Sequence, residues 1–223
     1  MKFKQKGFTL IELMVVIAIA AIMMAIAVPN FSEWIARRRV AAAAERVANI
    51  MRVARSEAVR LNKPVYVCPA KIKKDGKHNL SGNCKASDAG SGFVVWADND
   101  GDLKYVAAKD HNLRTVILNT PNEDAKVKYR MGMVAFGGGN INQDKAQGVV
   151  FYPDGSMKSL DISSAGNTKI HLVSGYVKLV FTDANAKTRE KREERSSIML
   201  LSGGQVSFCI RDQREACKYE DVI

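Results

Sequence analysis

The stretch Lys6-Gly7-Phe8-Thr9-Leu10-Ile11-Glu12-Leu13 opens an almost unbroken apolar run that ends at Val28. As a helix, residues 8–28 would be about 31 Å long at ~1.5 Å per residue. That length matches a membrane hydrocarbon core of roughly 30 Å. Glu12 is the one charged residue of the run. Because a carboxylate in lipid costs about 2.5–3.5 kcal/mol, its presence predicts a functional contact with a partner.

Two ordinary interpretations of this run remain open. Ala25-Ile26-Ala27 resembles the A-x-A cleavage site of a secretory signal peptide, although the run is longer than the usual apolar region of ~7–15 residues. A plain membrane anchor is the second interpretation. Neither explains the Gly-Phe-Thr-Leu-Ile-Glu string that begins at Gly7. A mature chain that starts at Val28 would decide for the signal peptide.

The start of the chain, with Lys2, Lys4 and Lys6 before Gly7, resembles the class III leader of type IV pilins and type II secretion pseudopilins. In that family a prepilin peptidase in the membrane cuts after the glycine and methylates the new first residue. The resemblance therefore implies cleavage between Gly7 and Phe8 and N-methylation of Phe8. It also implies a single pass through the lipid of the bacterial inner membrane, with the leader in the cytoplasm and the globular domain in the periplasm. The mature subunit would then enter a pilus or pseudopilus on the cell surface.

Glu12 is the expected assembly residue. It lies four positions after Phe8, so the two side chains share a helix face. A carboxylate in the first helical turn is also favoured by the helix dipole. In the resembled family this acid pairs with the terminal amine of a neighbouring pilin, which makes other pilins the expected partners. The residues alone leave open whether the pair forms within one chain or between two.

A second apolar pattern follows Pro29, where a kink is predicted because proline lacks a backbone donor. The pattern predicts a helix to about Leu61 with a buried seam on one face. The seam consists of Val40, Ala44, Val47, Met51, Ala54, Ala58 and Leu61, and the other faces carry Arg37, Arg38, Arg39, Arg46, Arg52, Arg55 and Arg60. Arg37 to Arg39 are expected near anionic headgroups, acidic residues of adjacent pilins, or plain solvent.

Residues beyond Pro64 show strand patterns separated by turns, and two stretches extend the resemblance to the GspH/FimT branch of the family. These are Arg55–Ala58 running into Val65–Cys68, and Gly92–Ala97 followed by an Asp/Asn/Gly turn. Further strands are predicted at 103–107, 113–118, 127–130, 133–136, 148–152, 197–201 and 205–210, and a hairpin is predicted from 170–173 and 176–181.

These patterns predict an α+β fold, in which a long kinked N-terminal helix packs on a mainly antiparallel β domain. The chain divides into a leader at 1–7, a transmembrane or assembly half-helix at 8–28, an amphipathic half-helix at 29–62 and a β-rich globular domain at 63–223.

The four cysteines, Cys68, Cys84, Cys209 and Cys217, indicate two disulfides in an exported domain. Three connectivities are open, and local pairing of Cys68 with Cys84 and of Cys209 with Cys217 is favoured because each pair closes a short polar segment. Zinc is the alternative, but no Cys-x-x-Cys is present and the histidines are scattered. Calcium at residues 98–102 is another, but the glycine and the twelfth position do not fit an EF-hand. No metal or cofactor is expected.

Three functions remain to be weighed. Catalysis is not among them, because no nucleophile–base pair or nucleotide motif is visible in the sequence. The first is a minor structural subunit of a type IV pilus. The second is a DNA-binding minor pilin for natural transformation, since the formal charge is +11, of which three charges belong to the leader. Its candidate contacts are Lys187, Arg189, Lys191, Arg192, Arg211 and Arg214. Gly204-Gln205-Val206-Ser207 lacks the two arginines of the Gly-Arg-x-Arg string in resembled DNA-binding members. The third is a type II secretion pseudopilin.

Overall fold

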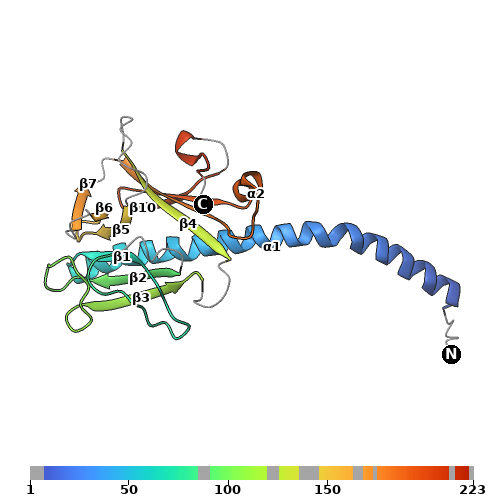
Figure 1. Ribbon diagram of the computed structural model, residues 1–223, viewed down its shortest axis with the longest axis horizontal. Helices are drawn as coiled ribbons and strands as arrows, with labels where there is room; N and C mark the ends of the chain where they lie inside the picture. The colour runs from blue at the N-terminus through green and yellow to red at the C-terminus, as the bar shows by residue number, and fades with distance from the viewer. Residues whose placement is uncertain are drawn as a thin grey trace, which may run out of the picture.

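A long helix projects from a β-rich domain in the computed structural model of the chain (Figure 1). The structure describes residues 8–84, 91–119, 126–135, 146–162, 168–172, 175–210 and 214–220. Within these ranges, the side chains of 26–30, 132–135, 146–147, 161–162 and 168–172 are not described. The leader, including Gly7, lies outside the described residues.

The helix α1 runs from Leu10 to Leu61. It begins after Thr9, whose side chain accepts a hydrogen bond from the Glu12 amide while the Glu12 side chain accepts one from the Thr9 amide. This reciprocal capping box explains why the helix begins two residues later than Phe8. The helix ends at Asn62, which adopts a left-handed conformation (φ 52°). It is continuous across Pro29, where a kink was predicted, and its axis curves gradually over the N-terminal half (Figure 1).

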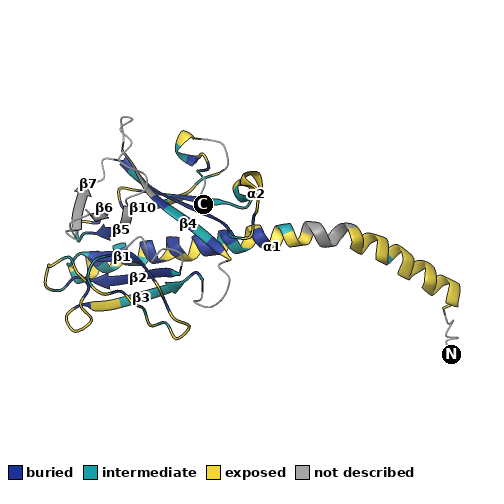
Figure 2. Ribbon diagram, in the orientation of Figure 1, coloured by how far each residue is buried: buried dark blue, intermediate teal, exposed yellow. Residues whose placement is uncertain are grey.

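The two halves of α1 lie in different surroundings (Figure 2). Val40, Ala44, Val47, Met51, Ala54 and Ala58 are all buried, and Leu61 packs against the core, so the predicted seam is confirmed. Its alanines let the helix backbone lie close to the sheets, where Phe93, Phe151 and Phe181 fill the space between them. No helix within the described residues offers an apolar stretch long enough to cross a membrane.

Two antiparallel sheets form the domain. The first has the order β3-β2-β1-β5-β6-β7, and the second has the order β10-β9-β8-β4. The strands of the first sheet are β1 Val65–Ala70, β2 Gly92–Ala97, β3 His111–Ile117, β5 Ala146–Phe151, β6 Met157–Ile162 and β7 Thr168–Leu172. Those of the second are β4 Val127–Ala135, β8 Gly175–Asp183, β9 Ser197–Ser202 and β10 Gln205–Phe208. One core joins α1 to both sheets, so the helix packs against each of them.

The predicted hairpin of 170–173 with 176–181 is wrong. β7 pairs with β6 in the first sheet, whereas β8 pairs with β4 and β9 in the second. The two strands follow each other in sequence, but the chain passes from one sheet to the other between them. Alternation of apolar and polar residues predicts that a segment is a strand. It does not predict which strand it pairs with, because pairing depends on residues distant in the sequence.

The strand predicted at 103–107 is also wrong. Apart from one isolated bridge between Tyr105 and Gly82, this segment forms turns. The Asp98 carboxylate accepts the amides of Gly101 and Leu103, and the Asp110 carboxylate accepts the amide of Val106. Such side-chain acceptors compete with a strand ladder for the backbone donors. The strands predicted at 127–130 and 133–136 are one strand, β4.

Both disulfides are formed, with the local pairing Cys68–Cys84 and Cys209–Cys217. The first lies in a second core on the other face of the six-stranded sheet, together with Tyr66 and Trp96. The Trp96 indole nitrogen donates to the sulfur of Cys68 at 3.4 Å. The second disulfide closes the segment beside β9, which contains the short 3-10 helix η2 Glu215–Cys217.

Candidate functional site

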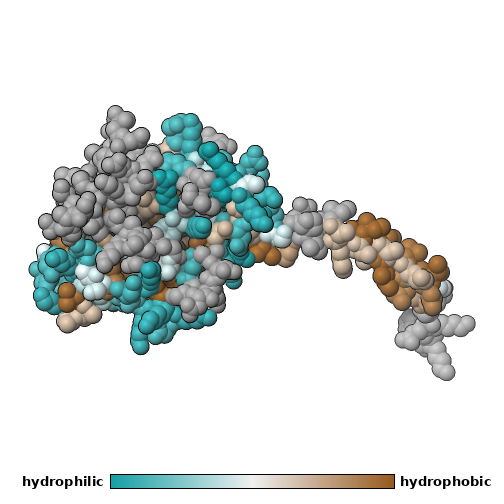
Figure 3. All heavy atoms as spheres, viewed as in Figure 1, coloured by the Kyte–Doolittle hydropathy of each residue, from teal (hydrophilic) through white to brown (hydrophobic). Residues whose placement is uncertain are grey.

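The part of α1 from Leu10 to Met24 is an apolar surface that no other described residue covers. Phe8 is 83% exposed, and the large apolar side chains from Leu10 to Met24 are exposed on every face of the helix. Figure 3 shows this arm as a continuous hydrophobic surface beyond a largely hydrophilic domain. Soluble monomers rarely expose contiguous apolar patches larger than a few hundred Å². The exposed apolar arm is therefore a surface that is more stable in contact with another apolar surface than in water.

The carboxylate of Glu12 points back toward the start of the helix. Its Oε2 accepts from the Thr9 amide at 3.4 Å and from the Thr9 hydroxyl at 3.5 Å. These contacts are long for hydrogen bonds to a charged acceptor. The Thr9 cap therefore holds the Glu12 carboxylate only weakly. Cleavage after Gly7 would leave a free amine on Phe8, the residue directly before Thr9.

An ion-pair network fixes the helix to the domain where α1 leaves it. Arg195 Nη2 binds Glu33 at 2.9 Å, and its Nη1 binds Asp183 at 2.7 Å. Asp183 is only 2% exposed. Arg37 adds longer contacts to Glu33 at 3.4 Å and to Glu194 at 3.6 Å. The hydrogen bond from Arg195 is the main reason that the pKa of Glu33 is lowered, and both carboxylates raise the pKa of Arg195.

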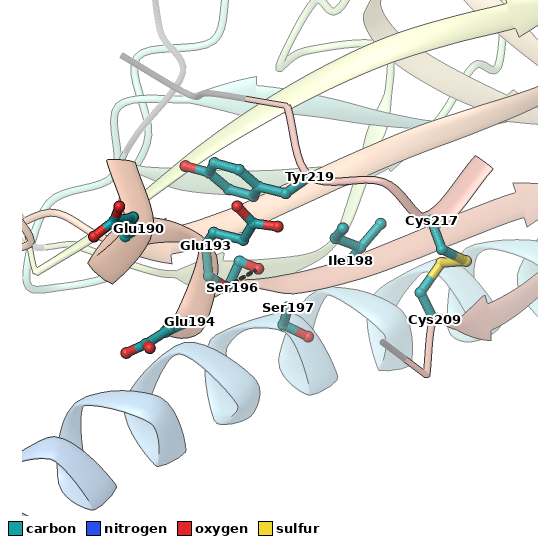
Figure 4. A pocket seen from close by; sticks show the side chains of 9 residues that line it. All are labelled: Glu190, Glu193, Glu194, Ser196, Ser197, Ile198, Cys209, Cys217 and Tyr219. Atoms are coloured by element: carbon teal, nitrogen blue, oxygen red, sulfur yellow. Dashed lines mark hydrogen bonds between the residues drawn. A yellow bond between two sulfur atoms is a disulfide. The ribbon is translucent and has the colours of Figure 1, made fainter. Parts of the chain in front are cut away.

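A hollow of about 310 Å³ lies beside this junction, between the short helix α2 (Arg189–Glu194), β9 and the Cys209–Cys217 disulfide. Figure 4 shows Glu193 beside the ring of Tyr219, with Ile198 and the disulfide farther along. The neighbouring Ser196 hydroxyl donates to the carbonyl of Glu193 at 2.7 Å. Glu190 and Glu194 complete the rim. The hollow is therefore acidic, which makes it unfavourable for phosphate.

Three further acids, Asp98, Asp100 and Asp102, place carboxylate oxygens within 4.8 Å of one another. Each already has a protein partner. Asp98 accepts two backbone amides, Asp100 binds Lys109 at 2.9 Å, and Asp102 accepts the amide of Lys104 at 2.8 Å. Burial raises the pKa of Asp98. The cluster holds the turn after β2, as the composition of the turn predicts.

Comparison with protein families matches residues 2–28 to the prokaryotic N-terminal methylation motif. Residues 43–182, well over half of the chain, match the family described as type II transport protein GspH. The chain belongs to the GspH family. The family is one of structural pilins and pseudopilins of the cell envelope and its surface filaments, so this member is a type IV pilin-like protein and not an enzyme.

Named relatives of this GspH-family chain are fimbrial proteins. The type IV major fimbrial protein FimA of Dichelobacter nodosus (strain VCS1703A) is 33% identical over 135 residues, which cover 59% of this chain and 70% of FimA. A fimbrial protein of Pseudomonas aeruginosa is 34% identical over 106 residues, or 46% of this chain and 67% of that protein. Among solved structures, the type IV minor pilin FimU of Pseudomonas aeruginosa aligns with a TM-score of 0.42 at 12% identity, covering 82% of this chain and 97% of FimU.

The described candidate DNA contacts of the GspH-family chain lie on or just before α2 and in the C-terminal segment. Lys187, Arg189 and Lys191 are exposed on or before α2, the helix that also carries the three glutamates of the acidic hollow. Arg192 turns inward and donates to the carbonyls of Ala186 and Lys187. Arg214 is exposed in the C-terminal segment. Arg211 lies outside the described residues. DNA binding stays a prediction.

Two features of the junction were missed in the sequence of the GspH-family chain. Glu33 and Arg195 are 162 positions apart, and no local pattern joins them. Phe31 and Trp34 stack with ring centroids 5.7 Å apart, and the Arg38 guanidinium lies 5.4 Å from the Trp34 ring. The sequence did contain a signal for this second feature, because aromatic and basic residues at i, i+3 and i+7 share one helix face.

Proposed function

We propose that this protein is a minor structural subunit of a type IV pilus, held in the inner membrane by α1 before assembly. The observation that carries the proposal is the apolar arm of α1, which is exposed on every face over residues 10–24 and carries one charge, Glu12. Lipid around the arm satisfies this surface before assembly. In the filament, the same surface is buried against the helices of other pilins.

Processing at Gly7 supplies a cationic partner for Glu12. Cleavage by a prepilin peptidase leaves a free amine on Phe8, and methylation keeps that amine basic. In a single chain the Glu12 carboxylate already caps the Thr9 amide. In an apolar filament core, an unpaired carboxylate is costly, so a neighbour's Phe8 amine is favoured over the weak cap. The pair then fixes the axial register between subunits.

The test has two parts. Mass spectrometry of the mature chain is expected to show loss of residues 1–7 and one added methyl group on Phe8. In a strain that makes both the parent chain and the variant, Glu12→Ala is expected to abolish incorporation of the variant into filaments. Glu12→Asp is expected to retain part of the incorporation. The double variant Glu12→Ala with Leu13→Asp serves as the matched control, because it restores the charge one position away and off the register. Normal incorporation of Glu12→Ala would refute the role of the charge.

A pseudopilus of type II secretion is the second candidate, favoured by the family match to the type II transport protein GspH over residues 43–182. The two systems use the same processing and the same helical assembly, so the surface of the domain must distinguish them. Crosslinking and copurification from the native cell separate the two candidates. Recovery with pilus subunits supports the first, and recovery with secretion-system components supports the second.

A further inference from the structure

One helical turn beyond the apolar run carries an exposed aromatic and basic cluster. We call Phe31, Trp34, Ile35, Arg38 and Arg39 the Trp34 patch; all are exposed except Arg39, which is half-buried. Phe31 and Trp34 stack on each other, Trp34 is 51% exposed, and Arg38 lies over its ring. The domain contacts this turn on another face, through Glu33 and the buried Ala36. Within the described residues, the aromatic rings and Arg38 of the Trp34 patch are therefore left largely uncovered.

The charges of the Trp34 patch are available to an outside partner. Arg37 is engaged by Glu33 and Glu194. Arg38 contacts the Trp34 ring, and within the described part of the chain neither Arg38 nor Arg39 forms an ion pair. An exposed aromatic pair beside two uncompensated cations is complementary to a surface that is apolar below and anionic above.

The position of the patch along α1 selects the partner. Trp34 lies six residues beyond Val28, or about 9 Å at ~1.5 Å per residue. The headgroup layer extends roughly 5–7 Å beyond the hydrocarbon on each side. Helical side chains lean toward the N-terminus, which brings the Trp34 ring down into this layer. Because Arg38 is held against that ring, its guanidinium reaches the same level.

We propose that the Trp34 patch docks on anionic phospholipid headgroups and so fixes the depth and facing of the subunit before assembly. The inference rests on the proposed membrane anchoring of α1. Tryptophan rings settle at the headgroup level of membranes, and basic side chains near the surface are attracted to anionic lipids. An acidic surface of a neighbouring subunit is the competing occupant. Lipid is favoured because the patch continues the apolar arm directly and lies where the headgroups begin.

The test uses the full chain in vesicles of phosphatidylcholine with or without phosphatidylglycerol, containing lipids brominated at shallow or deep acyl positions. The chain has two tryptophans, and Trp96 is only 1% exposed in the second core. Trp34→Phe therefore reports the Trp96 background, and the difference is the Trp34 signal. We expect shallow bromines to quench Trp34 more than deep bromines, and more strongly when phosphatidylglycerol is present.

The matched variants separate specific charges from general ones. Each basic side chain near an anionic surface strengthens docking about fivefold. Arg38→Gln with Arg39→Gln is therefore expected to remove the added quenching in phosphatidylglycerol vesicles. Arg52→Gln with Arg60→Gln removes the same charge farther along the helix and is expected to change nothing. Equal quenching in both lipids, or in both double variants, would overturn anionic recognition.

Flotation with the vesicles distinguishes the two proposals. A chain that floats after a high-salt wash while Trp34 is not quenched keeps the membrane anchor and overturns docking by the patch. A chain that does not float overturns both. If Arg38→Gln with Arg39→Gln leaves the lipid signal unchanged but weakens crosslinking between subunits, the occupant is an acidic protein surface and lipid docking is refuted.

Discussion

Replacement of Arg195 by methionine tests the ion-pair network that fixes α1 to the domain. The substitution keeps a long, unbranched side chain but removes the cation between Asp183 and Glu33. Asp183 is 2% exposed and would be left as a buried, uncompensated carboxylate. Glu33 lies at the surface, where water replaces much of the lost interaction. The effect is therefore expected to come mainly from Asp183.

The magnitude follows from the burial of Asp183. Breaking a buried ion pair by removing one partner costs about 3–5 kcal/mol. Asp183 retains one other contact, because its Oδ1 accepts the Asn185 amide at 3.1 Å. We therefore expect the free energy of unfolding to fall by about 3 kcal/mol, at the lower end of that range. Asp183→Asn with Arg195→Met removes the orphaned charge and should recover part of the loss.

Urea unfolding of a chain that starts at Phe31 measures this loss. No described residue before Ala36 is buried, so the shortened chain keeps the core. Arg37→Met is the control, since its contacts are longer and more exposed and exposed pairs contribute little. Equal losses for Arg37→Met and Arg195→Met would refute the argument, because the effect would then not follow burial. So would an Arg195→Met chain as stable as the parent.

The same variant has a predicted dependence on pH. The pKa of Glu33 is lowered from its ordinary value of 4.5, chiefly by the hydrogen bond from Arg195. A carboxyl with a lowered pKa in the folded state stabilises the fold above the unfolded value, and this contribution is lost as pH falls through the folded value. The part of the stability difference between the parent and Arg195→Met that comes from Glu33 should therefore be fully present above pH ~5 and should shrink as the pH falls below the ordinary value of Glu33. A difference that grows on acidification would contradict this assignment.

Three other predictions concern the domain. Cys68→Ala with Cys84→Ala should lower the free energy of unfolding by about 3 kcal/mol, because the bond closes a segment with a sequence separation of 16; urea titration measures it, and no change would contradict it. Gly204→Ala should lower the melting temperature, because Gly204 has φ +78° and a Cβ there would lie 2.4 Å from the Gly155 carbonyl oxygen. Gly101→Ala is the control and should cost less, because Gly101 also has a positive φ (+77°) but a Cβ there meets no atom within 4 Å. Binding to duplex DNA, measured by mobility shift, should be weak and should disappear with added salt, since glutamates share α2 with the candidate basic residues. Binding that survives physiological salt and is lost in Arg189→Gln with Lys191→Gln would support the DNA alternative.

The elements that local patterns specify were predicted well. The buried seam of α1 follows from its spacing alone, since each of its residues returns to one face of a helix. β1 and β2 were predicted close to their observed bounds because apolar runs end at clear turn signals. β6 was missed, because Met157–Ile162 alternates weakly and includes Lys158 and Asp161. Its place in the sheet comes from pairing with β5 and β7 on either side.

The partition of the strands into two sheets could not be predicted from the same patterns. β7 and β8 are adjacent in sequence and both alternate, so a hairpin was the local expectation. β7 pairs with β6 at the edge of the first sheet, whereas β8 pairs with β4 and β9 in the second sheet and packs against α1. The helix face that β8 covers is formed by residues more than a hundred positions earlier in the chain. Charged residues present the same difficulty within one short string.

The string from Lys187 to Arg195 contains residues with unrelated structural roles that charge counting treats alike. Arg195 joins the buried Asp183 to α1, Arg192 turns to backbone carbonyls, and Glu193 lines the acidic hollow.

The consequence for function lies at the turn of α1 around Glu33. One face of that turn is fixed to the domain by Arg195, and another presents Trp34 to the outside. In the proposed membrane state, the ion pair and the Trp34 patch together would determine which side of the domain faces the bilayer. Loss of Arg195 should then disturb the orientation of the subunit even where its anchor remains intact.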